Sequence, residues 1–232
     1  VGGMSSTAPR SLPQPPSPER VFRRAQVLLA VATRAMVELV PERHLELPRL
    51  RSWLTRRRLW PEAEASEVAV LTTDGGGLDA RSTIDGTWRA EGVAVLAWAL
   101  DLAPLPALEG PVDPSPYGAR LELLSGARTT PRALRPLAER ERYLGAAYAM
   151  HWRVCEAFAD PFPMDFAERL GSIGVDLTLV PLVDGDLAVQ GVPIGWLRRD
   201  RLRTVASIAK ERHQAAAWLC GCTARYDEVP EA

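Results

Sequence analysis

Lysine and cysteine are both scarce in this sequence, and each shortage limits what the chain can be. Lys210 is the only lysine among its 28 basic residues. Because arginine forms bidentate pairs that lysine cannot, we expect any buried ion pair to use arginine. The three cysteines, Cys155, Cys220 and Cys222, are few and odd in number for 232 residues. This argues against a disulfide framework and predicts a reducing, cytoplasmic location.

Long apolar runs and an excess of charge are also absent. A membrane-spanning helix needs roughly twenty apolar residues, and no stretch here approaches that length. The first residues show no charged segment followed by an apolar one, so we expect no secretory signal. The formal net charge is −1 at pH 7, which does not favour nucleic acid or a membrane surface as a partner.

The common signatures of catalysis are missing as well. The sequence has no Gly-x-Ser-x-Gly elbow, and Gly75–Gly77 is not followed by the Lys-Ser/Thr pair of a phosphate loop. We expect a thiol at Cys155, beside His151 on an apolar helix face, to be inert. The basic run Arg198–Arg203 is the best candidate for contacting a phosphate or an acidic partner, and we interpret it as a solvated face.

What the sequence does have is one strongly apolar stretch, Trp88–Leu100, around which we expect the rest of the chain to pack. Only Arg89 and Glu91 interrupt it and no proline breaks it, which predicts a helix buried on every side. At helical spacing Glu91 falls between Val95 and Trp98. An unpaired carboxylate in such a place would be costly, so Glu91 needs a partner.

The remaining patterns are mainly helical. Apolar residues recur at intervals of three and four, and the segments that carry them end at proline, glycine or capping residues. The central helix is predicted to start near Asp85 or Thr87 and to end before Pro104. We predict further helices over about 18–40, 47–58, 61–71, 116–124, 131–158 and 200–220.

Helical periodicity also predicts which side chains face the core. On 18–40, Arg24 and Arg34 are predicted to lie opposite the apolar side. On 131–158, Arg153 is predicted to face water. The inward side of that helix is predicted to consist of Leu137, Leu144, Tyr148, His151, Cys155 and Phe158.

One region departs from the helical pattern. Residues 175–183 alternate apolar and polar side chains, Asp184-Gly185 is a turn signal, and 186–190 can return as a partner strand. We therefore predict the fold class as mainly α. It is a single helical domain over 18–232 with a small β-hairpin insertion at about 174–192, preceded by a flexible tail over 1–17, of which 1–3 resemble a cloning remnant.

Three ionisable residues, Glu91, His151 and Arg212, fall on apolar helix faces. Buried charges persist when they are paired and hydrogen-bonded, so Glu91 and Arg212 are predicted partners across the core, with His151 as a candidate third member. Two interpretations stay open. The cluster is either a structural network that fixes helix register, or a polar pocket between helices for a small ligand or for acid–base chemistry.

A zinc site is an alternative use of the histidines. His151 and Cys155 are four residues apart on one helix, and His213 and Cys220 are seven apart on another. Together they could supply a His₂Cys₂ set. The spacings are not those of a known zinc module, and each side chain also suits core packing. We therefore expect no metal and no other cofactor.

Three segments, taken in order, resemble a known family. Trp88–Leu100 carries a WR-x-E start and a WAL end, Tyr148–Trp152 carries an HW pair, and Glu211–Leu219 carries an ER-x-x-A-x-x-W-L pattern. They resemble a bacterial domain-of-unknown-function family, number 4272, over about Arg20 to Val229. Ala217 departs from the pattern, because the family typically has asparagine there. The resemblance implies a helical fold and supplies no chemistry.

The missing catalytic signatures lead us to predict a non-enzymatic interaction or binding protein with an unidentified protein partner. The alternative is an enzyme or small-ligand binder with a polar inter-helix site formed by Glu91, His151 and Arg212. A solvent-connected pocket beside these side chains would favour the alternative. If the Glu91, His151 and Arg212 network were sealed from solvent, the function would instead be carried out by the protein surface.

Overall fold

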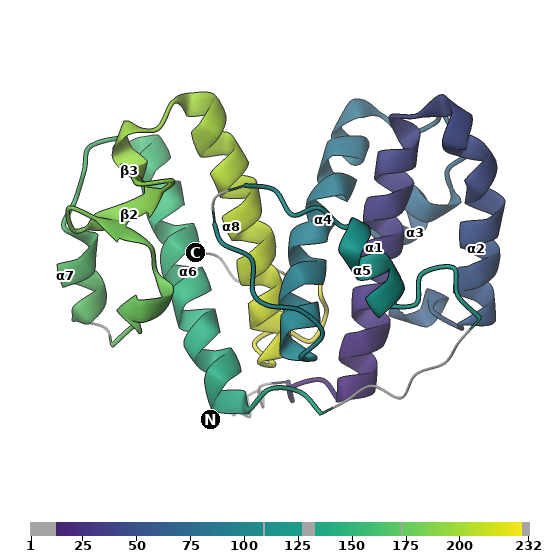
Figure 1. Cartoon of the computed structure of the whole chain (residues 1–232), viewed down its shortest axis with the longest axis horizontal. Coiled ribbons are helices and arrows are strands. Elements are labelled where there is room, and N and C mark those ends of the chain that lie inside the picture. The colour runs from purple at the N-terminus through teal and green to yellow at the C-terminus, as the bar shows by residue number, and fades with distance from the viewer. Residues whose placement is uncertain (1–12, 109, 127–132, 173, 229–232) are drawn as a thin grey trace, which may run out of the picture.

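The computed structural model describes residues 13–108, 110–126, 133–172 and 174–228 (Figure 1). As predicted, the fold is mainly α with a small antiparallel sheet. Within the described residues, no helix combines the length and the apolar character needed to cross a bilayer. The helices are α1 (Pro18–Glu38), α2 (Leu47–Arg56), α3 (Ala65–Thr72), α4 (Ala80–Ala99), α5 (Ser115–Arg120), α6 (Leu137–Ala159), α7 (Phe166–Gly171) and α8 (Arg199–Leu219).

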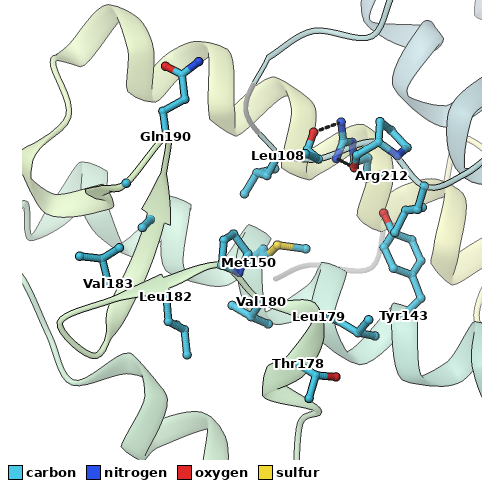
Figure 2. Close-up of a pocket in the computed structure, with 16 residues that line it drawn as sticks. Leu108, Tyr143, Met150, Thr178, Leu179, Val180, Leu182, Val183, Gln190 and Arg212 are labelled. Atoms are coloured by element: carbon cyan, nitrogen blue, oxygen red, sulfur yellow. Dashed lines mark hydrogen bonds between the residues drawn. The ribbon is translucent and has the colours of Figure 1, made fainter.

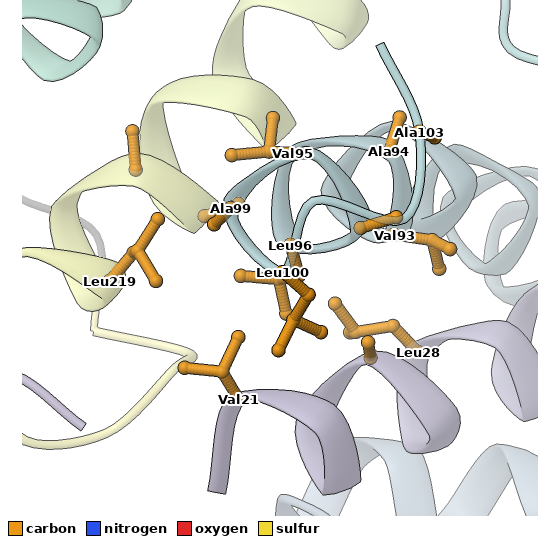
Figure 3. Close-up of a cluster of buried hydrophobic side chains, with 14 of the residues drawn as sticks. Val21, Leu28, Val93, Ala94, Val95, Leu96, Ala99, Leu100, Ala103 and Leu219 are labelled. Carbon is orange, nitrogen blue, oxygen red and sulfur yellow. The ribbon is translucent and has the colours of Figure 1, made fainter. Parts of the chain in front are cut away.

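The four long helices stand side by side in one row, in the order α1, α4, α8, α6 (Figure 1). Helices α2 and α3 pack on the outer side of α1, and the sheet and α7 lie beyond α6. The helix that carries Trp88–Leu100 therefore lies between α1 and α8, as expected of a central element. Figure 3 shows its apolar side chains meeting Val21 and Leu28 of α1 and Leu219 of α8.

The sheet is a three-stranded meander of β1 (Leu182–Val183), β2 (Asp186–Val189) and β3 (Val192–Pro193). The predicted hairpin is confirmed, with Leu182 opposite Leu187 across the Asp184-Gly185 turn. Its first strand is shorter than expected, because residues 177–179 form a 3₁₀ turn instead. Asp184 and Gly185 both have positive φ, and so do Gln190 and Gly191, which form a second turn. This second turn leads into the third strand, which the sequence analysis missed.

Two predicted helix starts were wrong because capping residues were overlooked. Helix α4 begins at Ala80, well before Asp85, since the Asp79 carboxylate accepts a hydrogen bond of 2.7 Å from the Ser82 backbone N–H. Helix α3 begins at Ala65 rather than Pro61, after a capping box. Helix α6 is helical from Leu137, and its predicted start at 131 lies outside the described residues.

The prediction that Arg24, Arg34 and Arg153 face solvent was wrong, since all three are fully buried. Each pairs with a carboxylate, and for Arg24 and Arg153 that carboxylate lies on another element, where periodicity along their own helix cannot reveal it. Arg153 of α6 binds Asp186 of β2, with Nε 2.7 Å from Oδ1. Arg24 of α1 binds Glu67 of α3, and Arg34 binds Glu38.

The inward face of α6 was also mispredicted in part, although His151 is buried as expected. Leu137, Tyr148, Cys155 and Phe158 are exposed, whereas Tyr143, Met150 and Val154 are buried. Helix α6 packs against α8 on one side and near the sheet on another, so its buried surface is broader than one apolar stripe and is rotated from the predicted one.

Only part of each end of the chain lies within the described residues. Residues 1–12, which include the predicted cloning remnant and most of the predicted tail, lie outside the described residues. Residues 13–15 lie against Gly221, whose φ is +77° and where a Cβ would meet the Pro13 carbonyl oxygen at 2.7 Å. Gly221 ends α8 as expected, because the following Cys222 N–H bonds back to the Ala217 carbonyl oxygen at 2.9 Å.

Gly86 marks a close approach of α4 to α1. A methyl group there would lie 2.7 Å from the Ala35 Cβ, whereas one on the helical Gly145 would have nothing within 4 Å. We expect Gly86→Ala to lower the free energy of unfolding by about 1–3 kcal/mol through overpacking. Gly145→Ala, the matched control, should raise it by about 0.5–1 kcal/mol through helix propensity. Urea denaturation compares the two, and equal effects would contradict the packing described.

Candidate functional site

The ion pair expected between Glu91 of α4 and Arg212 of α8 is present. Arg212 Nε and Nη2 both lie 2.9 Å from Glu91 Oε2, and both side chains are buried. Arg212 also donates to the carbonyl oxygens of Pro106 and Ala107, at 2.9 and 3.1 Å. The other Glu91 oxygen accepts from the Val112 N–H at 2.7 Å. The pair therefore anchors the segment that follows α4 against α8.

His151 belongs to a different contact. Its Nδ1 lies 3.1 Å from Nδ1 of His213, so α6 and α8 meet through two imidazoles, and the structure pairs His151 with His213 instead of Glu91. One ring must donate and the other accept, which requires at least one neutral ring. Burial, followed by the neighbouring His151, lowers the pKa of His213 to about 4. Burial and then Lys210 also lower the pKa of His151.

The four zinc candidates are not assembled into one site. His151 and His213 touch, but Cys155 is exposed. Burial raises the pKa of Cys220 to about 12, which keeps that thiol protonated. Among the residues that the structure describes, no three His, Cys, Asp or Glu side chains are grouped so that they could hold a metal ion.

A pocket of about 510 Å³ lies beside the Glu91–Arg212 pair (Figure 2). Residues 105–108 form one side, and residues 178–183 with the sheet form another. Tyr143 and Met150 of α6 and Arg212 of α8 complete the lining. Of the three residues in the predicted polar cluster, only Arg212 lines this pocket.

Tyr143 is the residue of this site that the sequence analysis missed. Its ring packs against Trp98 with centroids 5.1 Å apart, and the residue is 3% exposed. Its hydroxyl has no hydrogen-bond partner among the described residues. Burial raises the pKa of this hydroxyl to about 12, so it stays protonated. Figure 2 shows the hydroxyl directed toward the Arg212 end of the pocket.

The charge at the pocket is balanced. Among the described residues that line it, Arg212 alone is charged, and Glu91 compensates that charge from behind. Most of the other lining side chains are aliphatic. The basic run Arg198–Arg203 does not contribute to the lining, and its exposed Arg198 pairs with Asp200 at 3.2 Å. The pocket therefore combines mainly aliphatic side chains with the polar Thr178 and Gln190, one compensated charge at Arg212 and the unpaired hydroxyl of Tyr143.

Breaking the Glu91–Arg212 pair tests how much of the fold it supports. We expect Glu91→Leu to lower the free energy of unfolding by about 3–5 kcal/mol, because Arg212 would keep a buried, uncompensated charge. The double variant Glu91→Leu/Arg212→Met removes both charges and should be more stable than Glu91→Leu alone. Urea denaturation followed by circular dichroism gives both values. Measuring Arg212→Met in the same way supplies the second single loss, and a double variant whose loss equals the sum of the two single losses would contradict this account.

The histidine contact predicts a specific dependence of stability on pH. Since the pKa of His213 is lowered in the folded state, the unfolded chain binds a proton at higher pH than the folded chain does. The stabilising contribution of neutral His213 is present above about pH 6.5 and is lost as the pH falls toward 4, by up to about 3 kcal/mol.

His213→Gln supplies the comparison for that prediction, because glutamine does not titrate. The free energy of unfolding of the wild type should fall relative to the variant between pH 7 and pH 4, and acid-sensitive groups that do not contact His213 cancel in the difference. A difference between the two proteins that stays constant over this range would refute the assignment to His213.

Comparison with known proteins agrees with the resemblance noted from the sequence. The family described as "Domain of unknown function (DUF4272)" matches residues 8–164. The matched residues include Glu91 and Tyr143, whereas the sheet and α8 with Arg212 lie beyond them. No curated protein and no solved structure matches the chain. Because the match covers more than half of the sequence, the chain belongs to the DUF4272 family.

Proposed function

We propose that this protein is a non-enzymatic small-molecule-binding protein and that its ligand site is the pocket bordered by Tyr143 and Arg212. The observation that carries the proposal is Tyr143, which lines the pocket and whose hydroxyl is buried without a hydrogen-bond partner among the described residues. A buried polar group left unsatisfied costs about 1–3 kcal/mol. A ligand that accepts this hydrogen bond would recover that cost.

The size and lining of the pocket support the proposal. Its volume of about 510 Å³ falls within the range of roughly 300–1,000 Å³ typical of ligand pockets. Such pockets combine predominantly apolar walls with a few placed polar groups, as found here with Met150 and Val180 beside Tyr143 and Arg212. The contacts from Arg212 to Pro106 and Ala107 hold one side of the pocket in place.

The polar groups at the pocket favour binding over catalysis. A general acid or base works best when its pKa lies near the operating pH, and the pKa of Tyr143 is raised to about 12. Arg212 is held by Glu91 and by two carbonyl oxygens. Among the described lining residues there is no histidine, cysteine, lysine or carboxylate. We therefore assign the Glu91–Arg212 pair to positioning and His151 to the α6–α8 contact.

The proposal also covers location and partners. We propose a reducing, cytoplasmic location, in keeping with the three free thiols of Cys155, Cys220 and Cys222. The principal partner is a small molecule. Three expectations remain predictions from the sequence and from the family resemblance. They are that the protein has a protein partner, that it does not bind nucleic acid, and that it is of bacterial origin.

Filling the pocket tests the proposed site. Ala188 of β2 is buried and lines the pocket, so Ala188→Leu should occupy part of the ligand volume. N-phenyl-1-naphthylamine, a neutral apolar dye whose fluorescence rises on leaving water, serves as the probe. We expect saturable binding by the wild type and about tenfold or greater weakening by Ala188→Leu. Fluorescence titration measures both dissociation constants.

Ala80→Leu is the matched control, because Ala80 is exposed and does not line the pocket. It should bind the dye as the wild type does. Circular dichroism at the titration temperature confirms that each variant is folded. Equal dye binding by folded Ala188→Leu and wild type would show that the dye enters elsewhere, and the proposed site would be withdrawn.

A further inference from the structure

The geometry points to a specific ligand class: a neutral, elongated aliphatic molecule with one hydrogen-bond acceptor near one end, which the Tyr143 hydroxyl binds. This inference rests on the proposed function, because it assumes that the pocket is the ligand site. Three features of the pocket carry it, namely the shape of its apolar lining, its charge balance and the unpaired hydroxyl.

The apolar lining favours an aliphatic body over an aromatic one. Among the described lining residues Tyr143 is the only aromatic, and its ring already packs against Trp98. The remaining apolar contacts come from aliphatic or thioether side chains such as Leu108, Met150 and Val180. A ligand ring would therefore find few stacking partners, whereas an alkyl chain can follow the lining with ordinary dispersion contacts.

The charge balance favours a neutral ligand. Arg212 uses Nε, Nη1 and Nη2 on Glu91, Pro106 and Ala107. A ligand carboxylate or phosphate would find at most one N–H of Nη1 uncommitted and would leave one negative charge in excess. A ligand ammonium would find no free carboxylate, since Glu91 lies behind Arg212 and pairs with it. Burying either ion without a counter-charge is unfavourable.

The hydroxyl of Tyr143 favours an acceptor on the ligand. It is protonated because burial raises its pKa to about 12, so it has a proton to donate and nothing in the described structure receives it. A carbonyl, ester or ether oxygen of the ligand would accept the hydrogen bond that the Tyr143 hydroxyl can donate.

The layout of the pocket gives the ligand a direction. In Figure 2, Tyr143 and Arg212 lie at one end, while Leu182 and Val183 of β1 lie at the other. The polar end of the ligand would therefore lie between α6 and α8, and its alkyl chain would run toward the sheet. A molecule with its polar group at one end and an alkyl chain at the other matches this arrangement.

Four probes of similar length separate the alternatives. Methyl octanoate carries a neutral acceptor, undecane has the same number of heavy atoms and no acceptor, octanoate is an anion, and octylammonium is a cation. Each competes with N-phenyl-1-naphthylamine for wild-type protein and for Tyr143→Phe. The variant removes only the hydroxyl, and its undecane affinity reports whether the rest of the pocket is intact.

We expect methyl octanoate to bind the wild type at least about tenfold more tightly than either ion does. Tyr143→Phe should weaken methyl octanoate by about fivefold, the worth of one net hydrogen bond, and leave undecane unchanged. If octanoate bound more tightly than the ester, or if Tyr143→Phe left the ester affinity unchanged, the proposed ligand class would be wrong. The pocket would still be the ligand site. If no probe displaced the dye and Ala188→Leu bound it normally, the proposed function itself would fail.

Discussion

The buried ion pair between Glu91 and Arg212 is the contact on which the arrangement around the pocket depends. It joins α4 to α8 in the middle of the helix row, and its remaining hydrogen bonds reach Pro106, Ala107 and Val112. An extended, proline-containing segment is thereby fixed as one side of a pocket. Because Glu91 compensates the charge of Arg212, the pocket carries no net charge even though Arg212 lines it.

The parts of this picture that could be predicted are those that one helix or one turn determines. The apolar run Trp88–Leu100 predicts its own central place, since a helix without a polar face must be surrounded. Glu91 and Arg212 each stand on an apolar face, so their pairing follows from the cost of leaving either charge alone. The Asp184-Gly185 turn predicts the hairpin because both residues adopt positive φ there.

The parts that could not be predicted depend on contacts between distant elements. Arg153 looks like a surface residue until β2 brings Asp186 against it. His151 was predicted only as a candidate third member of the Glu91–Arg212 pair, yet α8 also presents His213, and the two imidazoles contact each other without a carboxylate. Tyr143 gives no signal in the sequence, because a buried tyrosine with a bonded hydroxyl and one with an unpaired hydroxyl share the same helical spacing. Only the assembled pocket distinguishes them.

A crystal structure of the protein with methyl octanoate tests the central claim most directly. The account predicts the ester within the pocket, its carbonyl oxygen about 2.7–2.8 Å from the Tyr143 hydroxyl oxygen, its chain directed toward Leu182 and Val183, and the Glu91–Arg212 pair intact. Ester bound elsewhere, or a Tyr143 hydroxyl bonded to a protein group while the pocket is closed by side chains, would contradict it.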